Sequence, residues 1–337
     1  MLVNSGPNPN DSTNIIPAEQ DRPASGIVVT GTGSARTLVL VVITFVLVAL
    51  LMFTSLGTTT ARAAWQEIQQ LLKLQGKPEP ASANILSEHE LEGLDKMPSQ
   101  SQAGLLLERS INHYRGANDQ IAARVARWRG DIELDDHLRG LFMTALNSDD
   151  LRVRAAAIEI DLAARNMQKT SAQVDELEPA ARNGEQGPRA NALWDIGLLG
   201  NRGVEPDRAA EILTSSIHDS NVNIRYWAVE GLSYLGTDAV INPLLEAFRD
   251  DPSPMIRERA ACGLAQSGML SEKQRRTAVP KLLDYSDDQA LDEETRKWVF
   301  QALRDITGQS LPHDSAAWRN WYNSGDSKWN PVTHDEQ

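Results

Sequence analysis

Residues 219–236 (DSNVNIRYWAVEGLSYLG) and residues 251–268 (DPSPMIRERAACGLAQSG) share one pattern. Each begins with an aspartate, has an arginine six residues later and ends with a glycine eleven residues after that arginine. Apolar residues stand three, four and seven positions after each arginine, which places them on one face of a helix. Each stretch therefore predicts a tight polar turn followed by an amphipathic helix.

The arginine-led pattern occurs five times between residues 150 and 308. Its arginines are Arg154, Arg189, Arg225, Arg257 and Arg296. Successive arginines are 35, 36, 32 and 39 residues apart. An apolar helix face that returns at such a period is typical of a stacked helical repeat. The sequence thus predicts an all-α fold, an α-solenoid of about five helical hairpins with helical caps.

Each hairpin should consist of a first helix, a short polar turn and a second helix that begins near the arginine. The first helices are expected at approximately 135–146, 171–182, 205–218, 238–248 and 272–283. Asp219 and Asp251 are expected to cap the second helices and shape the turns. The five arginines should form a structural ladder with these aspartates, each reaching a carboxylate or carbonyl in its own or the adjacent repeat.

Glycines follow four of the second helices, at Gly200, Gly236, Gly268 and Gly308. Glycine readily adopts the left-handed conformation that ends a helix, so we expect these four to be C-terminal caps. Asn166 takes the equivalent place in the first repeat. The only cysteine, Cys262, lies on a repeat helix and is expected to be a small, partly buried side chain.

The Asp-x₅-Arg spacing, the alanine-rich apolar face and the closing Leu-Gly resemble bacterial HEAT repeats, including those of the phycobilisome-lyase type. The resemblance covers residues 135–308 and is strongest at 219–236 and 251–268. It implies an α-solenoid, a fold that serves many unrelated functions. The segment after residue 302 also looks like the end of some bacterial HEAT proteins, with an aromatic helix (Trp318, Trp321, Tyr322) folded over the last repeat.

The rest of the chain divides by composition. We expect a disordered tail (1–36), a transmembrane helix (37–57), a juxtamembrane helix and linker (58–86), an N-terminal helical cap (87–134), the repeats (135–308), and a C-terminal cap and tail (309–337). Within the N-terminal cap, Ser87 and Glu90 have the spacing of a capping box, and a helix break is expected near Gly116.

Residues 37–57 (TLVLVVITFVLVALLMFTSLG) contain no charge and are long enough to cross a bilayer as a helix. The alternative is a cleaved signal peptide, since Ala61-Arg62-Ala63 resembles a cleavage site. The apolar run is longer than the roughly 7–15 residues of a signal-peptide core, which favours a retained single-pass anchor. Arg36 favours a cytoplasmic N-terminus, which in a bacterium places the anchor in the inner membrane and the repeats in the periplasm.

The net charge of the chain is −13. Residues 1–36 hold three acids and two arginines, which leaves −12 on the remainder. Such an acidic solenoid repels phosphate backbones, so nucleic acid is not an expected partner. The six histidines show no metal-ligand spacing, and no phosphate-binding, nucleophile or redox motif is present, so we expect no catalytic, metal or cofactor site.

Aromatic residues recur on the side of the second helices that faces away from the predicted core. The second helix of a HEAT repeat lines the concave face, and the candidate partner-binding residues there are Trp194, Tyr226, Trp227, Glu230, Arg259 and Trp298. Tryptophan, tyrosine and arginine dominate the energetics of protein interfaces. The alternative is that Trp227 and Trp298 pack against the neighbouring second helix in the stack.

Three classes of function remain. The first is a membrane-tethered, non-catalytic scaffold that binds another protein on its concave face. The second is a chromophore lyase acting on bilins, and the third is a HEAT-like nucleic-acid-binding enzyme. The first class agrees with the acidic charge and with the lack of a catalytic pattern, and it is our interpretation of the sequence.

Overall fold

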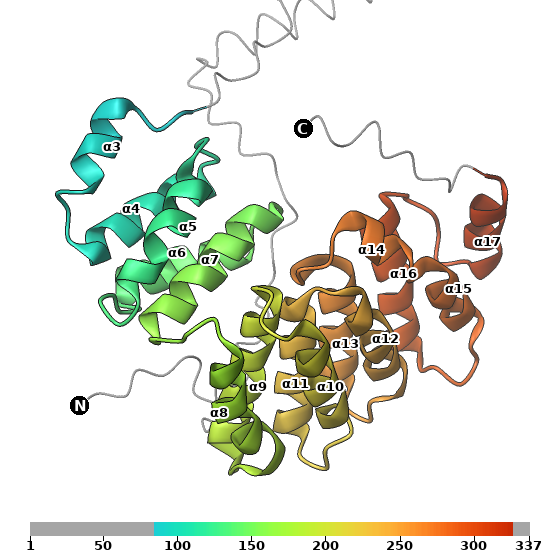
Figure 1. Cartoon of the computed structure of the whole chain (residues 1–337). Helices are drawn as coiled ribbons and strands as arrows, with labels where there is room; N and C mark the ends of the chain where they lie inside the picture. Colours follow the sequence, from blue (N-terminus) through green and yellow to red (C-terminus); the bar gives the residue numbers. More distant parts are fainter. Residues whose placement is uncertain (1–83, 326–337) are drawn as a thin grey trace, which may run out of the picture. The chain divides into compact units, whose positions relative to one another are not determined.

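The computed structural model describes residues 84–325, and the regular secondary structure in this range is helical (Figure 1). An isolated bridge joins Ile85 to Arg115. The predictions for 1–36, for the transmembrane segment 37–57 and for 58–83 lie outside the described residues. Within the described range, no helix has both the length and the apolar character needed to cross a membrane.

The five predicted hairpins are present. The first helices are α6 (Asp136–Leu146), α8 (Ser171–Asn183), α10 (Pro206–Ser216), α12 (Ile241–Asp250) and the pair α14 (Glu272–Arg276) and α15 (Val279–Asp287). The second helices are α7 (Leu151–Ala164), α9 (Gln186–Asn201), α11 (Val222–Leu235), α13 (Pro254–Cys262) and α16 (Glu293–Thr307). For α6, α8 and α10, the expected and observed helix bounds agree to within a few residues.

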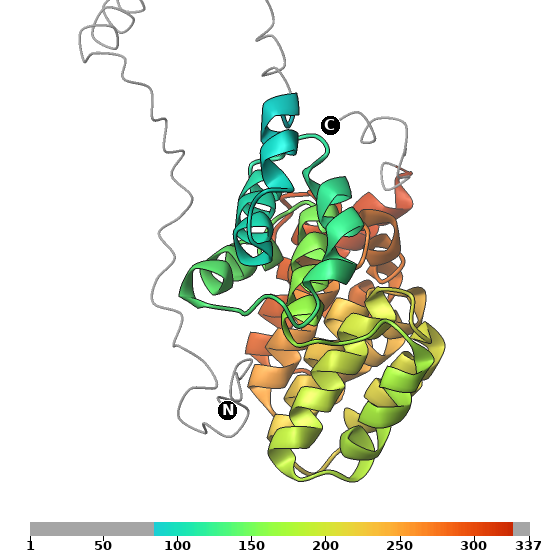
Figure 2. The same cartoon turned by 60° about the vertical axis from the view of Figure 1, so that its left-hand side comes forward.

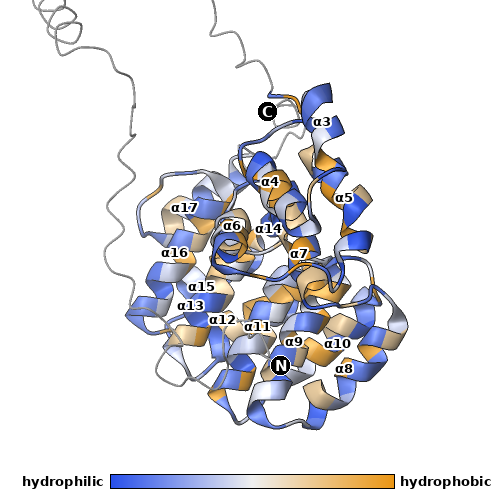
Figure 3. Ribbon diagram, turned by 90° about the vertical axis from the view of Figure 1, so that its left-hand side faces the viewer, coloured by the Kyte–Doolittle hydropathy of each residue, from blue (hydrophilic) through white to orange (hydrophobic). Residues whose placement is uncertain are grey.

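From α8 onward the hairpins stack in two layers (Figures 1 and 2). Helices α9, α11, α13 and α16 are successive neighbours in one layer, and each packs on a first helix of the other layer. The apolar residues of both layers form one buried core, and hydrophobic and hydrophilic residues alternate along these helices (Figure 3). Burial of these faces is the main driving force for stacking, because no single hairpin can bury its apolar side alone.

The helices at the start of the described range form a second core. Helices α3 (Glu88–Leu94), α4 (Ser99–Ile111) and α5 (Ala117–Trp128) pack with α6 and α7 around the buried Trp128, whose indole N–H donates to Gln102 Oε1 at 3.1 Å. The capping box of Ser87 and Glu90 is present, and the chain breaks at Gly116, where φ is +88°. The first repeat, α6 and α7, therefore belongs mainly to this core rather than to the row that follows.

Three of the five helix-ending predictions are confirmed. Gly236 and Gly308 adopt left-handed conformations (φ +68° and +70°), as does Asn166 (φ +56°). The prediction for Gly200 was wrong, because α9 continues to Asn201 and the left-handed residue is Gly203.

Gly268 is also not a left-handed cap, since its φ is −88° and its ψ is −174°. After α13, the second helix of this repeat continues instead as a π-helical turn, η2 (Gly263–Ser267). Gly268 is required there for close packing: a Cβ at this position would lie 2.4 Å from the carbonyl oxygen of Gly263 and 2.7 Å from that of Ser233. A glycine that follows a helix can thus be needed either for a left-handed backbone or for close packing against a neighbour. Sequence spacing does not distinguish these two roles.

Two first helices differ from the prediction. The helix expected at 238–248 starts with a 3₁₀ turn, η1 (Asp238–Val240), before α12. The helix expected at 272–283 is split into α14 and α15. Pro280 stands in the first turn of α15, where its missing N–H and its fixed φ are tolerated, whereas a continuous helix would place it in the interior.

Two side-chain predictions at the surface have different outcomes. Cys262 is exposed, so its expected partial burial was wrong. The aromatic helix is present as α17 (Ser315–Asn323), and it packs on α15. Its Trp318 is completely buried, with the indole N–H donating to Pro312 O at 2.9 Å.

Candidate protein-binding surface

The arginine ladder connects successive hairpins. Arg189 contacts Asp219 at 2.7 Å, Arg225 contacts Asp251 at 2.8 Å, and Arg257 contacts Asp292 at 2.8 Å. In each pair the arginine belongs to one repeat and the aspartate to the turn of the next. The same three arginines also donate to carbonyl oxygens of their own hairpins, those of Ala181, Asp219 and Asp251.

Asp292 is the N-cap of α16, but Asp219 and Asp251 are not the caps of their second helices, which corrects the expectation. Asn221 and Ser253 occupy the N-cap positions of α11 and α13. Asp219 and Asp251 stand two residues earlier and accept the backbone N–H of these residues at 2.7 and 2.8 Å. Each aspartate therefore shapes its turn and receives the arginine of the preceding repeat.

The ladder changes at its two ends. Arg296 donates to Leu291 O at 2.7 Å, in the turn of its own hairpin. Arg154 is buried and donates to Ser148 O in its own turn, but also to Gln266 O and Gly268 O at 2.8 and 2.5 Å, more than a hundred residues away. Gln266 lies in η2 and Gly268 is its C-cap, so the guanidinium supplies donors at the end of this turn, together with Arg275, which donates to Gln266 O at 3.0 Å. Burial lowers the pKa of Arg154.

An aromatic cluster lies on the second helices α9 and α11. We define it as Trp194, Tyr226, Trp227 and Tyr234. The rings of Trp194 and Trp227 meet edge to face at 6.0 Å between centroids, those of Trp194 and Tyr234 at 5.0 Å, and those of Tyr226 and Trp227 at 5.7 Å. Tyr234 is buried, and the other three are partly buried.

The packing alternative is confirmed for Trp227, and its role in partner binding stays a prediction. It packs edge-on against Trp194 of the neighbouring second helix and on the repeat core, and it keeps part of its surface exposed. Trp298, on α16, also packs on the core while partly exposed, but among the described residues it has no ring contact with the cluster. The structure thus brings Trp194, Tyr226 and Trp227 together and leaves Trp298 apart from them.

Glu230 and Arg259 bind each other beside the aromatic cluster. The guanidinium donates from Nε to Oε1 at 2.5 Å and from Nη2 to Oε2 at 2.8 Å, and its Nη1 donates to Ser267 Oγ at 2.6 Å. Burial by itself would lower the pKa of Arg259. The charge and hydrogen bonds of the Glu230 carboxylate have the larger effect, so the net pKa of Arg259 is raised. The two predicted charged contacts are therefore one neutral, bidentate pair that is largely enclosed.

Burial changes the acidity of the tyrosines in this region. Desolvation, followed by the charge of Glu230, raises the pKa of Tyr226 and that of Tyr234 well above the ordinary value. Both phenols are neutral at physiological pH already at their ordinary pKa, and the raised pKa keeps them neutral at more alkaline pH. Together with the neutral Glu230–Arg259 pair, they make the cluster an uncharged surface with polar groups at its edge.

Two pockets lie away from the cluster, and the sequence did not indicate either. One, of about 430 Å³, lies beside the ladder between the end of α10 and the end of α12, and Asp219, Arg225 and Asp251 contribute to its wall. The other, of about 220 Å³, lies between α5 and α7. Within residues 84–325, no group of three or more His, Cys, Asp or Glu side chains is arranged to hold a metal ion.

Comparison with known proteins agrees with the repeat geometry. A family model described as HEAT repeats matches residues 174–265, which extend from α8 into η2. No curated protein matches the chain. The match lies inside the range 135–308 for which we expected HEAT repeats, and it does not specify the phycobilisome-lyase type. Residues 174–265 are thus similar to HEAT repeats, and an all-α solenoid carries the candidate surface.

Proposed function

We propose that this protein is a non-catalytic scaffold that binds a segment of another protein on the second-helix face of its HEAT-like repeats. The aromatic cluster carries this proposal. Three large aromatic side chains, Trp194, Tyr226 and Trp227, lie together and keep part of their surface exposed on neighbouring helices. Such residues provide most of the binding energy in protein interfaces.

The cluster is also rigid, which favours binding. Each ring is held edge-on by another, and the Glu230–Arg259 pair ties α11 to α13 next to them. Side chains that are already ordered lose little conformational entropy when a partner binds. The net charge of −13 would attract a basic partner segment at long range, although Glu230 is neutralised and does not select such a residue directly.

The decisive test removes two partly exposed aromatic side chains of the second-helix face, Trp227 of the cluster and Trp298 of α16. Trp227→Ala combined with Trp298→Ala is expected to reduce capture of the partner from membrane extracts at least about tenfold, because hot-spot truncations cost on the order of 2 kcal/mol or more. Capture on immobilised full-length chain, with quantitative mass spectrometry, measures the loss. Tyr322→Ala, on α17 outside the cluster, is the matched control and should capture normally.

Circular dichroism separates the outcomes of this test. If the double variant loses its helical signal, the tryptophans act as core residues and the proposed binding surface is wrong. A variant that folds and still captures the partner would place the contact elsewhere, for example on the helices of 87–134. Turnover of a bilin by the purified chain would instead support the lyase alternative.

We also propose that residues 37–57 form a retained membrane anchor with a cytoplasmic N-terminus. The support is the uncharged sequence of this segment and its length. Intact mass of the purified chain is expected to include these residues, and a reporter fused at the C-terminus should be active only on the periplasmic side. A mature chain that starts near Ala64 would show that the segment is cleaved.

A further inference from the structure

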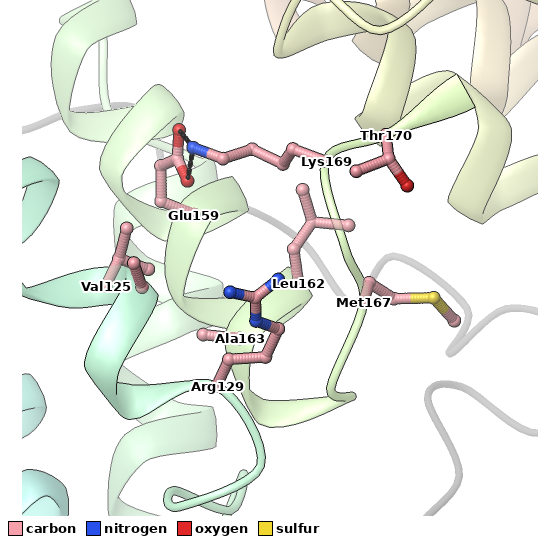
Figure 4. A pocket seen from close by; sticks show the side chains of 9 residues that line it. Val125, Arg129, Glu159, Leu162, Ala163, Met167, Lys169 and Thr170 are labelled. Carbon is pink, nitrogen blue, oxygen red and sulfur yellow. Dashed lines mark hydrogen bonds and ion pairs between the residues drawn. The ribbon is translucent and has the colours of Figure 1, made fainter. Parts of the chain in front are cut away.

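A small pocket lies between α5, α7 and the loop that follows α7 (Figure 4). Its apolar wall includes Val125 of α5, Leu162 and Ala163 of α7, and Met167 of the loop. Arg129, which ends α5, extends into the same space (Figure 4). The pocket thus combines apolar walls with a cationic group.

The charge of Arg129 is not used within the described fold. It is partly buried, yet it has no hydrogen-bond or ion-pair partner among residues 84–325. Arg124, on the same helix, shows the usual alternative, because it donates to Gln120 and to Asp95. The guanidinium nitrogens of Arg129 are not among the buried, unpartnered polar atoms, so water reaches them, and an anionic ligand would replace that water with charge-assisted hydrogen bonds.

The remaining charges of the pocket cancel without Arg129. Glu159 accepts hydrogen bonds from Lys169 Nζ at 2.8 and 3.0 Å, and it lies 3.6 Å from Arg202. Glu159 and Lys169 both line the pocket and cancel each other, and Arg202 contacts Glu159 from outside the lining. The pocket has a net positive charge in a chain whose total charge is −13.

We propose that this pocket binds a protein segment in which an acidic residue is followed by an apolar one. The side-chain carboxylate would accept two hydrogen bonds from Arg129, and the apolar side chain would pack on Val125, Leu162 and Met167. Bidentate pairing of arginine with carboxylate gives both strength and orientation. This site is separate from the aromatic cluster and does not depend on it.

The size of the pocket decides between a peptide and a free small molecule. Its volume of about 220 Å³ is below the roughly 300–1,000 Å³ typical of sites that enclose a whole ligand. It suits the entry of one or two side chains from a segment that otherwise lies on the surface. A phosphate group would need several polar donors, and Lys169, which lines the pocket beside Arg129, is already paired with Glu159.

The test uses the full-length chain labelled with ¹³C at its methionine methyl groups. Met167 lines the pocket, and its signal is assigned with Met167→Leu among the seven methionines. The probe N-acetyl-Glu-Leu-amide is expected to shift the Met167 signal with a dissociation constant on the order of 1 mM, as for a small ligand with few contacts. N-acetyl-Gln-Leu-amide and N-acetyl-Glu-Ser-amide remove the charge and the apolar side chain in turn, and each should bind about tenfold more weakly.

Arg129→Gln is expected to weaken binding of N-acetyl-Glu-Leu-amide about tenfold and to abolish the preference for Glu over Gln. Arg127→Gln, at an exposed position of the same helix, is the matched control and should bind normally. Because the Glu and Gln probes are also compared on the unmodified chain, the test does not depend on how well the variant folds.

Several outcomes would overturn the proposal. They are an unresponsive Met167 signal, equal binding of the Glu and Gln probes, or a normal affinity in Arg129→Gln. Tighter binding of the free acid 4-methylvalerate than of the peptide probe would assign the pocket to a small carboxylic acid instead. Loss of partner capture in the Trp227 and Trp298 double variant leaves all these readouts unchanged, so the two sites are tested separately.

Discussion

Replacing Arg225 with alanine is expected to lower the free energy of unfolding by about 3–5 kcal/mol. Arg225 and Asp251 have side-chain exposures of only 10% and 2%. Without the guanidinium, the Asp251 carboxylate remains buried beside apolar helices with no cation to match it. The carbonyl oxygens of Asp219 and Ser220 also lose their donor. Chemical denaturation followed by circular dichroism measures the loss.

The burial of this pair sets the size of the effect. The ladder pattern alone supports a loss of about 1–3 kcal/mol, the cost of an unsatisfied hydrogen-bonding group. Arg152→Ala is the matched control, because Arg152 pairs with Asp150 at 2.8 Å but is 79% exposed. Exposed pairs contribute at most about 1 kcal/mol. An Arg225 variant as stable as this control would show that the ladder is solvated.

A second variant identifies the buried charge as the cause. Asp251→Asn removes the charge but keeps an oxygen that can accept the Ser253 N–H. In that background Arg225→Ala should cost at least about 1 kcal/mol less than in the unmodified chain, since the two side chains are directly coupled. Equal costs in both backgrounds would assign the loss to the carbonyl contacts alone.

Replacing Gly197 with alanine is expected to destabilise the repeats by about 3 kcal/mol, at the upper end of the usual range for overpacking. Gly197 lies on α9 where this helix touches α11. A Cβ at Gly197 would lie 2.6 Å from the carbonyl oxygen of Gly231 and 2.7 Å from its Cα. These are backbone atoms, so the overlap can be relieved only by separating the two helices. Thermal and chemical denaturation report the effect.

Substitution of an exposed helical glycine is expected to have the opposite effect on stability. A Cβ at Gly140, on α6, would have no neighbouring atom within 4 Å, so Gly140→Ala is expected to stabilise the fold by up to about 1 kcal/mol. Alanine is favoured there because it restricts the unfolded chain and suits the helix. If both substitutions raised stability, helix propensity would outweigh interhelical contact and the tight α9–α11 packing would be refuted.

Local spacing was sufficient to predict the helices. The apolar face after each arginine, the capping box of Ser87 and Glu90, and the left-handed residues Gly236 and Gly308 depend on contacts within a few residues. Hydrogen bonds and side-chain periodicity at this range are set by neighbouring residues, so they can be read from the chain. The same reasoning failed at Gly200 and Gly268, where close packing needs a glycine: a Cβ at Gly200 would lie 2.5 Å from Leu235 Cδ1, and one at Gly268 would lie 2.7 Å from Ser233 O.

The candidate surface was only partly predictable. Spacing placed Trp194, Trp227 and Trp298 at comparable positions of their helices, but it did not show that Trp194 and Trp227 touch while Trp298 stands apart. It suggested Glu230 and Arg259 as separate contacts, whereas in the fold they neutralise each other. Which outward residues meet depends on how far each second helix is rotated and shifted against the next, and this depends on the packing of the whole stack.

The repeating helical architecture follows from the amino-acid order, because each hairpin must bury the same apolar face and can do so only against another hairpin. Tertiary structure alone decided the partners of the buried charges. Arg154 has the same local sequence pattern as Arg225, yet it binds the carbonyls that end η2, while Arg225 binds Asp251. Arg129 belongs to no sequence pattern that we identified. It is a candidate binding residue only because the packing of α5 on α7 places it in the wall of a pocket. A buried charge takes whichever acceptor the packed helices bring near, and no local rule specifies that choice.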